Sequence, residues 1–268
     1  MDRPVTIYCF TGTGNTLIAA RAMGDIFAEA GLACDIVPLE RADPARVPLD
    51  RCVGVACPVA VFATYPLVWR FLEALPVAQG TPFFLLATMG GMAGGLAGPV
   101  RAIITAKGYR ALGARQIVMP SNMFVREGTA REEEKRRRAV AQAAGFAREL
   151  IAETAGWNYV PVVGTVLGAF SRGITRICWG STLARRMWKA QSTGACTGCG
   201  LCARVCPVGA ASIDAATRRA AFGAECEFCF RCAGVCPAHA IRISGGPSEP
   251  YCALPREDLV RFVTPTEK

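Results

Sequence analysis

The sequence predicts an α/β protein: a doubly wound parallel sheet of five strands, followed by a small α+β domain that binds metal. Two observations lead to this class. Strand-like apolar runs alternate with helical patterns over roughly the first 155 residues, as in doubly wound sheets. Near the other end, four cysteines occur in CTGCGLCARVCP, residues 196–207, and again in CEFCFRCAGVCP, residues 226–237. This repeat indicates two copies of one structural unit.

The expected elements follow one another in regular order. The first strand covers residues 5–10 and leads through a polar loop into a helix over 17–30. Further strands are expected over residues 33–38, 52–57, 82–88 and 116–119. A long exposed helix is expected to begin with a capping box of Thr129 and Glu132, and to carry Glu/Arg pairs at 132/136, 133/137 and 134/138.

The loop after the first strand, TGTGNT, has the composition of a phosphate site. A strand, a polar loop and a helix place backbone amides and a helix N-terminus against an anion. The loop lacks lysine, which disfavours a nucleoside triphosphate, and Leu17 stands where a dinucleotide fold has its third glycine. Neutral hydroxyl donors suit the phosphate of FMN. The alternative is a domain without cofactor in which the loop is only a turn. The predicted phosphate contacts are Thr11, Gly12, Thr13, Gly14, Asn15 and Thr16.

Two later loops leave the carboxyl ends of strands, where the flavin ring is expected. CPVAVFATYP, residues 57–66, offers Phe62 and Tyr65 as stacking aromatics. Either ring could instead pack under the following helix. TMGGMAGG, residues 88–95, offers backbone to the polar edge of the ring at Thr88, Gly90 and Gly91.

The run CxxCxxCxxxCP is typical of bacterial two-cluster ferredoxins. Three closely spaced cysteines can face one [4Fe-4S] cubane, whereas the longer gap and the proline carry the fourth toward the other cluster. Two ligand sets are therefore predicted. The first cysteine set is Cys196, Cys199, Cys202 and Cys236; the second cysteine set is Cys226, Cys229, Cys232 and Cys206. Zinc is the main alternative, but paired CxxC hooks leave the third cysteine of each run without a role.

Composition argues against several other classes of protein. Fourteen cysteines without an apolar signal segment predict the reducing cytoplasm and argue against a disulfide framework. The formal charge of +9 falls to about +3 once two clusters and FMN are counted, so nucleic acid is not expected as a partner. No apolar run is long enough to cross a bilayer. A Ser/His/Asp triad is not expected as hydrolase machinery, since the single histidine, His239, lies three residues past Cys236 at the end of the cysteine repeat.

Residues 156–190 change in composition. They contain Trp157, Trp179 and Trp188 together with several arginines. Such a segment can pack between domains, dock a partner or lie on a membrane surface, and the first role is preferred. The expected domains are a flavin-binding domain over 1–155, this segment over 156–190, a ferredoxin domain over 191–247 and a tail over 248–268.

TGTGNT resembles the phosphate loop of flavodoxins, and the order of elements resembles theirs. This resemblance implies strand order 2-1-3-4-5, with FMN at the switch point. Cys9 and Phe10 depart from it, because many flavodoxins have an aromatic residue and then glycine there. The whole chain resembles the flavodoxin-ferredoxin fusion proteins of anaerobic bacteria and archaea.

The resemblance implies an intracellular protein that relays electrons between FMN, two [4Fe-4S] clusters and an external redox partner protein. Two other functions stay open. One is a flavin-dependent iron-sulfur oxidoreductase acting on NAD(P)H or a small substrate. The other is an electron-delivering scaffold subunit of a larger redox complex.

Overall fold

The computed structural model describes residues 1–91, 95–123, 127–157, 170, 173, 177, 179, 188–247 and 249–264. Its contacts divide the chain into two compact units. Unit 1 comprises Met1–Phe10, Thr16–Pro120 and Gly128–Thr175, and unit 2 comprises Thr11–Asn15, Ser121–Glu127 and Arg176–Lys268. The predicted phosphate loop therefore belongs, by its contacts, to unit 2. The domain boundaries expected from the sequence stay a prediction.

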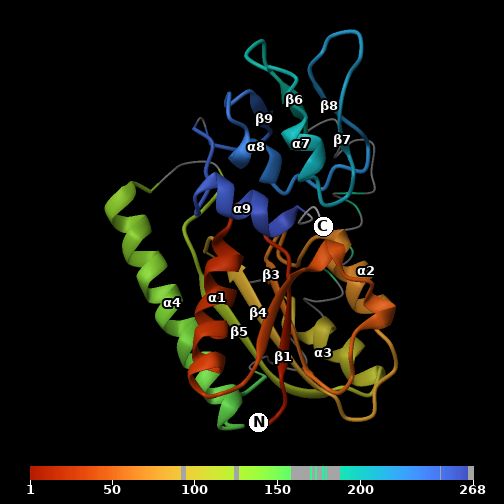
Figure 1. Cartoon of the computed structure of the whole chain (residues 1–268), viewed down its shortest axis with the longest axis vertical. Helices are drawn as coiled ribbons and strands as arrows, with labels where there is room; N and C mark the ends of the chain where they lie inside the picture. The colour runs from red at the N-terminus through yellow and green to blue at the C-terminus, as the bar shows by residue number, and fades with distance from the viewer. Residues whose placement is uncertain are drawn as a thin grey trace. The chain divides into compact units, whose positions relative to one another are not determined.

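Unit 1 contains one five-stranded sheet, whose strands are labelled in Figure 1. The strands are β1 (Val5–Cys9), β2 (Cys34–Pro38), β3 (Cys52–Pro58), β4 (Pro82–Met89) and β5 (Arg110–Val118). Every neighbouring pair is parallel, and the order is β2-β1-β3-β4-β5. This is the flavodoxin-like order, so the predicted fold class is confirmed.

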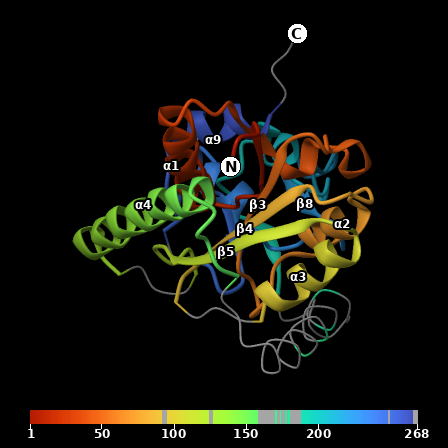
Figure 2. The same cartoon turned by 90° about the horizontal axis from the view of Figure 1, so that it is seen from below.

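Helices cover both faces of this sheet, as Figure 2 shows. They are α1 (Asn15–Glu29), α2 (Pro66–Ala74), α3 (Ala97–Ala106) and α4 (Thr129–Ile151), with short 3-10 turns at Leu39–Arg41 and Pro44–Arg46. Phe84 of β4 contacts Phe27 of α1 and Phe146 of α4, with ring centroids 6.2 and 6.1 Å away. Its neighbour Phe83 faces the other way, toward Tyr109. Burial on both faces explains why β4 is almost continuously apolar.

The edge strand β5 begins earlier than the sequence predicts. Its first half contains small residues and two arginines, and Arg110 and Arg115 form ion pairs with Glu153 and Glu149. An edge strand has one partner and tolerates exposed charge, so a search for apolar runs finds only its buried end.

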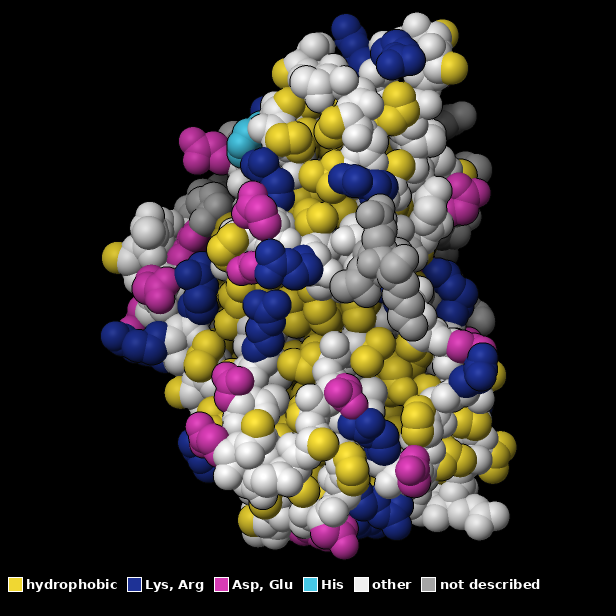
Figure 3. Space-filling view, viewed as in Figure 1, with side chains coloured by type: hydrophobic (Ala, Val, Ile, Leu, Met, Phe, Trp, Pro, Cys, Tyr) yellow, Lys and Arg dark blue, Asp and Glu magenta, His cyan; other side chains and the backbone are white. Residues whose placement is uncertain are grey.

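The start of α4 also differs from expectation. Its N-cap is Gly128, at φ 90°, and no side chain caps the helix, so the predicted capping box of Thr129 and Glu132 is wrong. Glu132 is buried, and on the surface Glu133 pairs with Arg136 and Glu134 pairs with Arg137 and Arg138. Figure 3 shows the resulting mixture of blue and magenta side chains over this helix.

Unit 2 is small and mixed in structure, as predicted. Its strands form two antiparallel pairs, β6 (Ala190–Ser192) with β9 (Ile241–Ile243) and β7 (Ala211–Ile213) with β8 (Ala220–Phe222). Its helices are α7 (Leu201–Arg204), α8 (Arg231–Val235) and α9 (Arg256–Val263). Helix α9 was not expected; its Leu259 and Val263 pack with Val205 and Val235. Among the described residues, no helix has the length and apolar character needed to cross a membrane.

Candidate functional site

The first cysteine set surrounds one hollow in unit 2. Cys196, Cys199, Cys202 and Cys236 all line it. Three of these thiols come from the first run and one from the second. The remaining lining includes Leu201, Ile213 and Ile241, so the walls beside the sulfur atoms are largely apolar.

The thiols of the second cysteine set shift one another's pKa values through electrostatic interactions. Burial raises the pKa of Cys229 to about 12, with Cys226 and Cys206 raising it further and Arg231 opposing the rise. Burial also raises the pKa of Cys226 and of Cys232, and the neighbouring Cys206 adds to both shifts. The fourth cysteine of the first run therefore acts on the pKa of all three leading cysteines of the second, and Cys202 also acts on that of Cys232.

Backbone amides point at three of the thiols. Ala210 donates to Cys206 at 3.2 Å, and Ala240 donates to Cys236 at 3.3 Å. These two bonds occupy equivalent positions in the repeat. Ala220 donates to Cys196 at 3.3 Å. Amide donors stabilise negative charge on sulfur, which is what a thiolate ligand requires.

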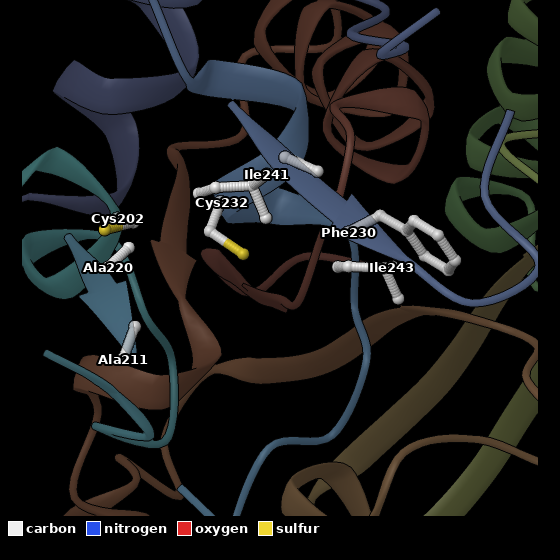
Figure 4. Close-up of a cluster of buried hydrophobic side chains, with 8 residues drawn as sticks. Cys202, Ala211, Ala220, Phe230, Cys232, Ile241 and Ile243 are labelled. Carbon is white, nitrogen blue, oxygen red and sulfur yellow. The ribbon is translucent and has the colours of Figure 1, made fainter. Parts of the chain in front are cut away.

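The surroundings of the thiols are apolar. Figure 4 shows Cys202 and Cys232 among the side chains of one buried cluster, which also contains Phe230, Ile241 and Ile243. No group of three or more His, Cys, Asp or Glu side chains within the described residues is placed to hold a single metal ion. The grouping of the first cysteine set rests on the shared hollow, and that of the second cysteine set rests on the electrostatic effects among its thiols.

The two cysteine runs use left-handed backbone at equivalent places. Gly198 and Gly200 have φ of 69° and 74°, and the second run has Phe228 and Phe230 at 53° and 64°. Glycine adopts this conformation at little cost, whereas phenylalanine does so only under strain. At these two positions the second run therefore has phenylalanine rings, whereas the first run has glycines.

The predicted phosphate loop ends at the N-terminus of α1, which has no acidic residue in its first turn. The Gly14 amide donates to Thr11 Oγ1 at 3.1 Å, and Asn122 donates to Thr13 Oγ1 at 3.4 Å. Each threonine oxygen accepts in these bonds, so each O–H still has a proton to donate to an anion. This donor chemistry fits a phosphate group.

Residues of unit 2 far along the chain hold the same loop. The Ala253 amide donates to the Thr13 carbonyl at 2.7 Å, and Tyr251 Oη donates to Asn15 Oδ1 at 2.8 Å. The Leu254 side chain lies beside Gly14. Sequence reasoning treated this C-terminal segment as a tail and missed it, because none of its residues belongs to a motif.

The two candidate aromatics have different environments in unit 1. Tyr65 is buried and packs edge-on against Phe10, with centroids 5.2 Å apart. Phe62 is 47% exposed and lies in a two-residue turn closed by hydrogen bonds between Ala60 and Ala63. Phe62 is therefore the aromatic that is accessible to a ligand, and Tyr65 is a core residue.

The β4 loop contributes one polar contact to this region. Thr88 Oγ1 lies 2.8 Å from Thr16 Oγ1, so the two hydroxyls share a buried hydrogen bond. Gly90 and Gly91 follow β4 and are accessible to solvent. A Cβ added at Gly91 would meet no atom of the described residues within 4 Å.

A comparison with protein families matches the cysteine-rich region to a known domain. Residues 195–240, which contain both cysteine sets, match the family model of the 4Fe-4S dicluster domain. The chain therefore combines a sheet of flavodoxin-like strand order with a segment that matches the 4Fe-4S dicluster domain. Comparison with curated proteins finds no match.

Among solved structures, three flavodoxins are similar to part of the chain. One from an archaeon is 10% identical, with TM-score 0.40, over 55% of this chain and 99% of its own. The flavodoxin of Megasphaera elsdenii is 22% identical, with TM-score 0.40, over 52% and 98%. That of Streptococcus pneumonia TIGR4 is 14% identical, with TM-score 0.42, over 56% and 98%. The fold class is set by the strand order β2-β1-β3-β4-β5.

Proposed function

We propose that this chain relays electrons between FMN, two [4Fe-4S] clusters and an external redox protein. One observation carries the proposal: the four thiols of the first cysteine set, drawn from both runs, line a single hollow inside the 4Fe-4S dicluster region. Cross-ligation between runs is how two-cluster ferredoxins build their sites.

The ligand assignment is part of the proposal. The first cysteine set would hold one cluster and the second cysteine set the other. The effect of Cys206 on the pKa of Cys226, Cys229 and Cys232 supports its place in the second set. The amides of Ala210 and Ala240, on Cys206 and Cys236, support matched roles for the two exchanged cysteines.

For FMN, we propose that residues 11–16 bind the phosphate and that Phe62 stacks on the ring, with Thr88, Gly90 and Gly91 at its polar edge. The O–H donors of Thr11 and Thr13 and the N-terminus of α1 suit a dianion. The exposure of Phe62 suits stacking. Tyr65, a predicted ring contact, is better assigned to supporting Phe10.

When bound, FMN exchanges two electrons or one, and each cluster exchanges one, so the chain can join paired-electron and single-electron donors. The protein supplies cysteine ligands, amide donors to sulfur and a dry setting. The reduced thiols that this chemistry needs favour a reducing compartment such as the cytoplasm. With its cofactors the net charge is about +3, which gives no reason to invoke nucleic acid.

Anaerobic purification followed by metal, sulfide and flavin analysis tests this function. The expected content is about eight irons and eight acid-labile sulfides per chain, with one FMN released on denaturation. Zinc in place of iron would reject the cluster assignment. Iron without flavin, even after incubation with FMN, would reject the flavin assignment and leave the cluster assignment standing.

A further inference from the structure

A buried arginine lies inside the second cysteine run. Arg231 is 1% exposed and stands between Cys229 and Cys232. Its guanidinium donates twice to the Thr11 carbonyl, from Nε at 3.0 Å and Nη2 at 2.8 Å, and once from Nη1 to the Val205 carbonyl at 3.0 Å. One side chain therefore joins the second cysteine run, the residue before Cys206, and the phosphate loop.

The repeat shows that the cysteine loop itself does not require this arginine. Thirty residues earlier, the equivalent position is Leu201, which packs with Val205 and Val235. Burying an arginine is costly unless its donors are satisfied. Arg231 replaces an apolar residue only in the half that meets the phosphate loop, which points to a role in that contact.

A second contact joins the same two loops. The Cys229 carbonyl lies against Gly12, where an added Cβ would be 2.1 Å from the oxygen. The backbone of a predicted cluster ligand therefore touches the backbone of the predicted phosphate loop.

The second cysteine set is also the more enclosed of the two. Trp179 Nε1 donates to the Glu227 carbonyl at 3.1 Å, and the Trp188 ring lies 6.2 Å from that of Phe228. Cys229 and Cys232 are buried, whereas Cys199 of the first set is exposed. Protein donors exchange electrons most readily where a cofactor approaches the surface.

We propose that the cluster of the second cysteine set exchanges electrons with the flavin, with Arg231 as the positioning residue, and that the cluster of the first set exchanges them with the external protein. This inference rests on the proposed function. The flavin phosphate loop and the second cysteine run are held together by two hydrogen bonds from Arg231 to the Thr11 carbonyl and by the Gly12 contact. Electrons would then pass from flavin to the enclosed cluster, then to the exposed cluster, or in reverse.

Repeat-equivalent ligand variants test the order of transfer in the full chain. Cys196→Ala and Cys226→Ala each remove the leading ligand of one set. After flash reduction of the bound flavin, Cys196→Ala should keep the fast flavin-to-cluster phase and lose electron transfer to cytochrome c as a probe acceptor. Cys226→Ala should lose the fast phase. The reverse pattern, with both cofactors present, would overturn the inference but not the proposed function, which fails only if iron or flavin is missing from the wild type.

Arg231 variants test the positioning role. Removing the guanidinium charge in Arg231→Leu should lower the reduction potential of the second-set cluster alone and slow the flavin-to-cluster phase. Arg231→Lys should restore the potential without restoring the full rate, since one ammonium cannot hold both carbonyls. The matched control, Arg204→Leu, removes an exposed arginine and should change neither. A wild-type potential and rate in Arg231→Leu would overturn the role; if that variant assembles no clusters, Arg231→Lys decides by the same two measurements.

Discussion

The carbonyl oxygen of Cys229 occupies the space that a side chain on Gly12 would need. A Cβ at residue 12 would lie 2.1 Å from that oxygen, and the obstacle is backbone, which cannot rotate away. The Gly12→Ala variant should therefore force the two loops apart and lower the free energy of unfolding by about 1–3 kcal/mol. FMN affinity should fall with it, because the loop carries the proposed phosphate donors. Urea unfolding and flavin titration measure the two effects.

Gly194→Ala is the matched control in unit 2. A Cβ there meets nothing within 4 Å. Its midpoint of unfolding and its flavin affinity should stay at the wild-type values. Equal effects from the two alanines would contradict the close contact at Gly12.

The hydroxyl of Tyr251 should stabilise the phosphate loop. It donates to buried Asn15 Oδ1 at 2.8 Å, so Tyr251→Phe leaves that oxygen without this donor. The expected loss is about 1–3 kcal/mol. Tyr109→Phe is the control, since the buried Tyr109 hydroxyl has no hydrogen-bond partner among the described residues and its removal should be neutral or stabilising. Calorimetric unfolding of both variants compares them, and a larger loss from Tyr109→Phe would refute the account.

The turn that presents Phe62 is strained. Val61 and Phe62 have φ of 48° and 61°, both in the left-handed region that suits Asn and Gly. Val61→Asn should raise the free energy of unfolding by about 1 kcal/mol and leave the flavin bound. Val77→Asn is its control at an exposed position, Val77 being 77% exposed, and should have little effect.

Phe62→Gly separates the two roles of that turn. It relieves the same strain but removes the proposed stacking ring, so stability should rise while FMN affinity falls. Thermal unfolding and fluorescence titration of released flavin measure both. Undiminished FMN affinity would remove Phe62 from the proposed site.

Two thiols in β3 predict a loss of stability at alkaline pH. Burial raises the pKa of Cys52 and of Cys57 to about 12, from an ordinary value of about 9. The unfolded chain releases these protons above pH 9 while the folded chain keeps them, so their stabilising contribution is present below pH 9 and declines as the pH rises toward 12. Circular dichroism at increasing pH measures the decline.

Cys57→Ala should flatten this alkaline decline. Val55→Ala, a buried neighbour in the same strand, is the control. It should lower stability similarly at every pH, because it removes volume without removing a titrating group. Identical pH profiles for the two variants would show that the thiol is not responsible.

Most of the architecture could be predicted from the sequence. The apolar strands β1, β3 and β4 are buried on both faces and stand out as apolar runs, and the cysteine repeat marks both ligand sets by spacing alone. The first half of β5 could not be found this way, because small residues and two ion-paired arginines interrupt its apolar pattern.

Contacts between segments that are distant in the sequence could not be predicted from motifs. Arg231 lies 220 residues from Thr11, and Tyr251 lies 236 residues from Asn15. The repeat did contain a signal for Arg231, since a charged residue replaces Leu201 at an equivalent position. For Tyr251 and Ala253 the sequence offers no local pattern, because their roles depend on the folded chain bringing them against the phosphate loop.

The exchange of Cys206 and Cys236 between the two cysteine sets is the central claim, and EPR of the reduced protein tests it most directly. Each single alanine variant should lose one cluster signal and keep the other. The spectrum of Cys206→Ala should match that of Cys226→Ala, and the spectrum of Cys236→Ala should match that of Cys196→Ala. If Cys206→Ala instead matches Cys196→Ala, each run holds its own cluster and the account is contradicted.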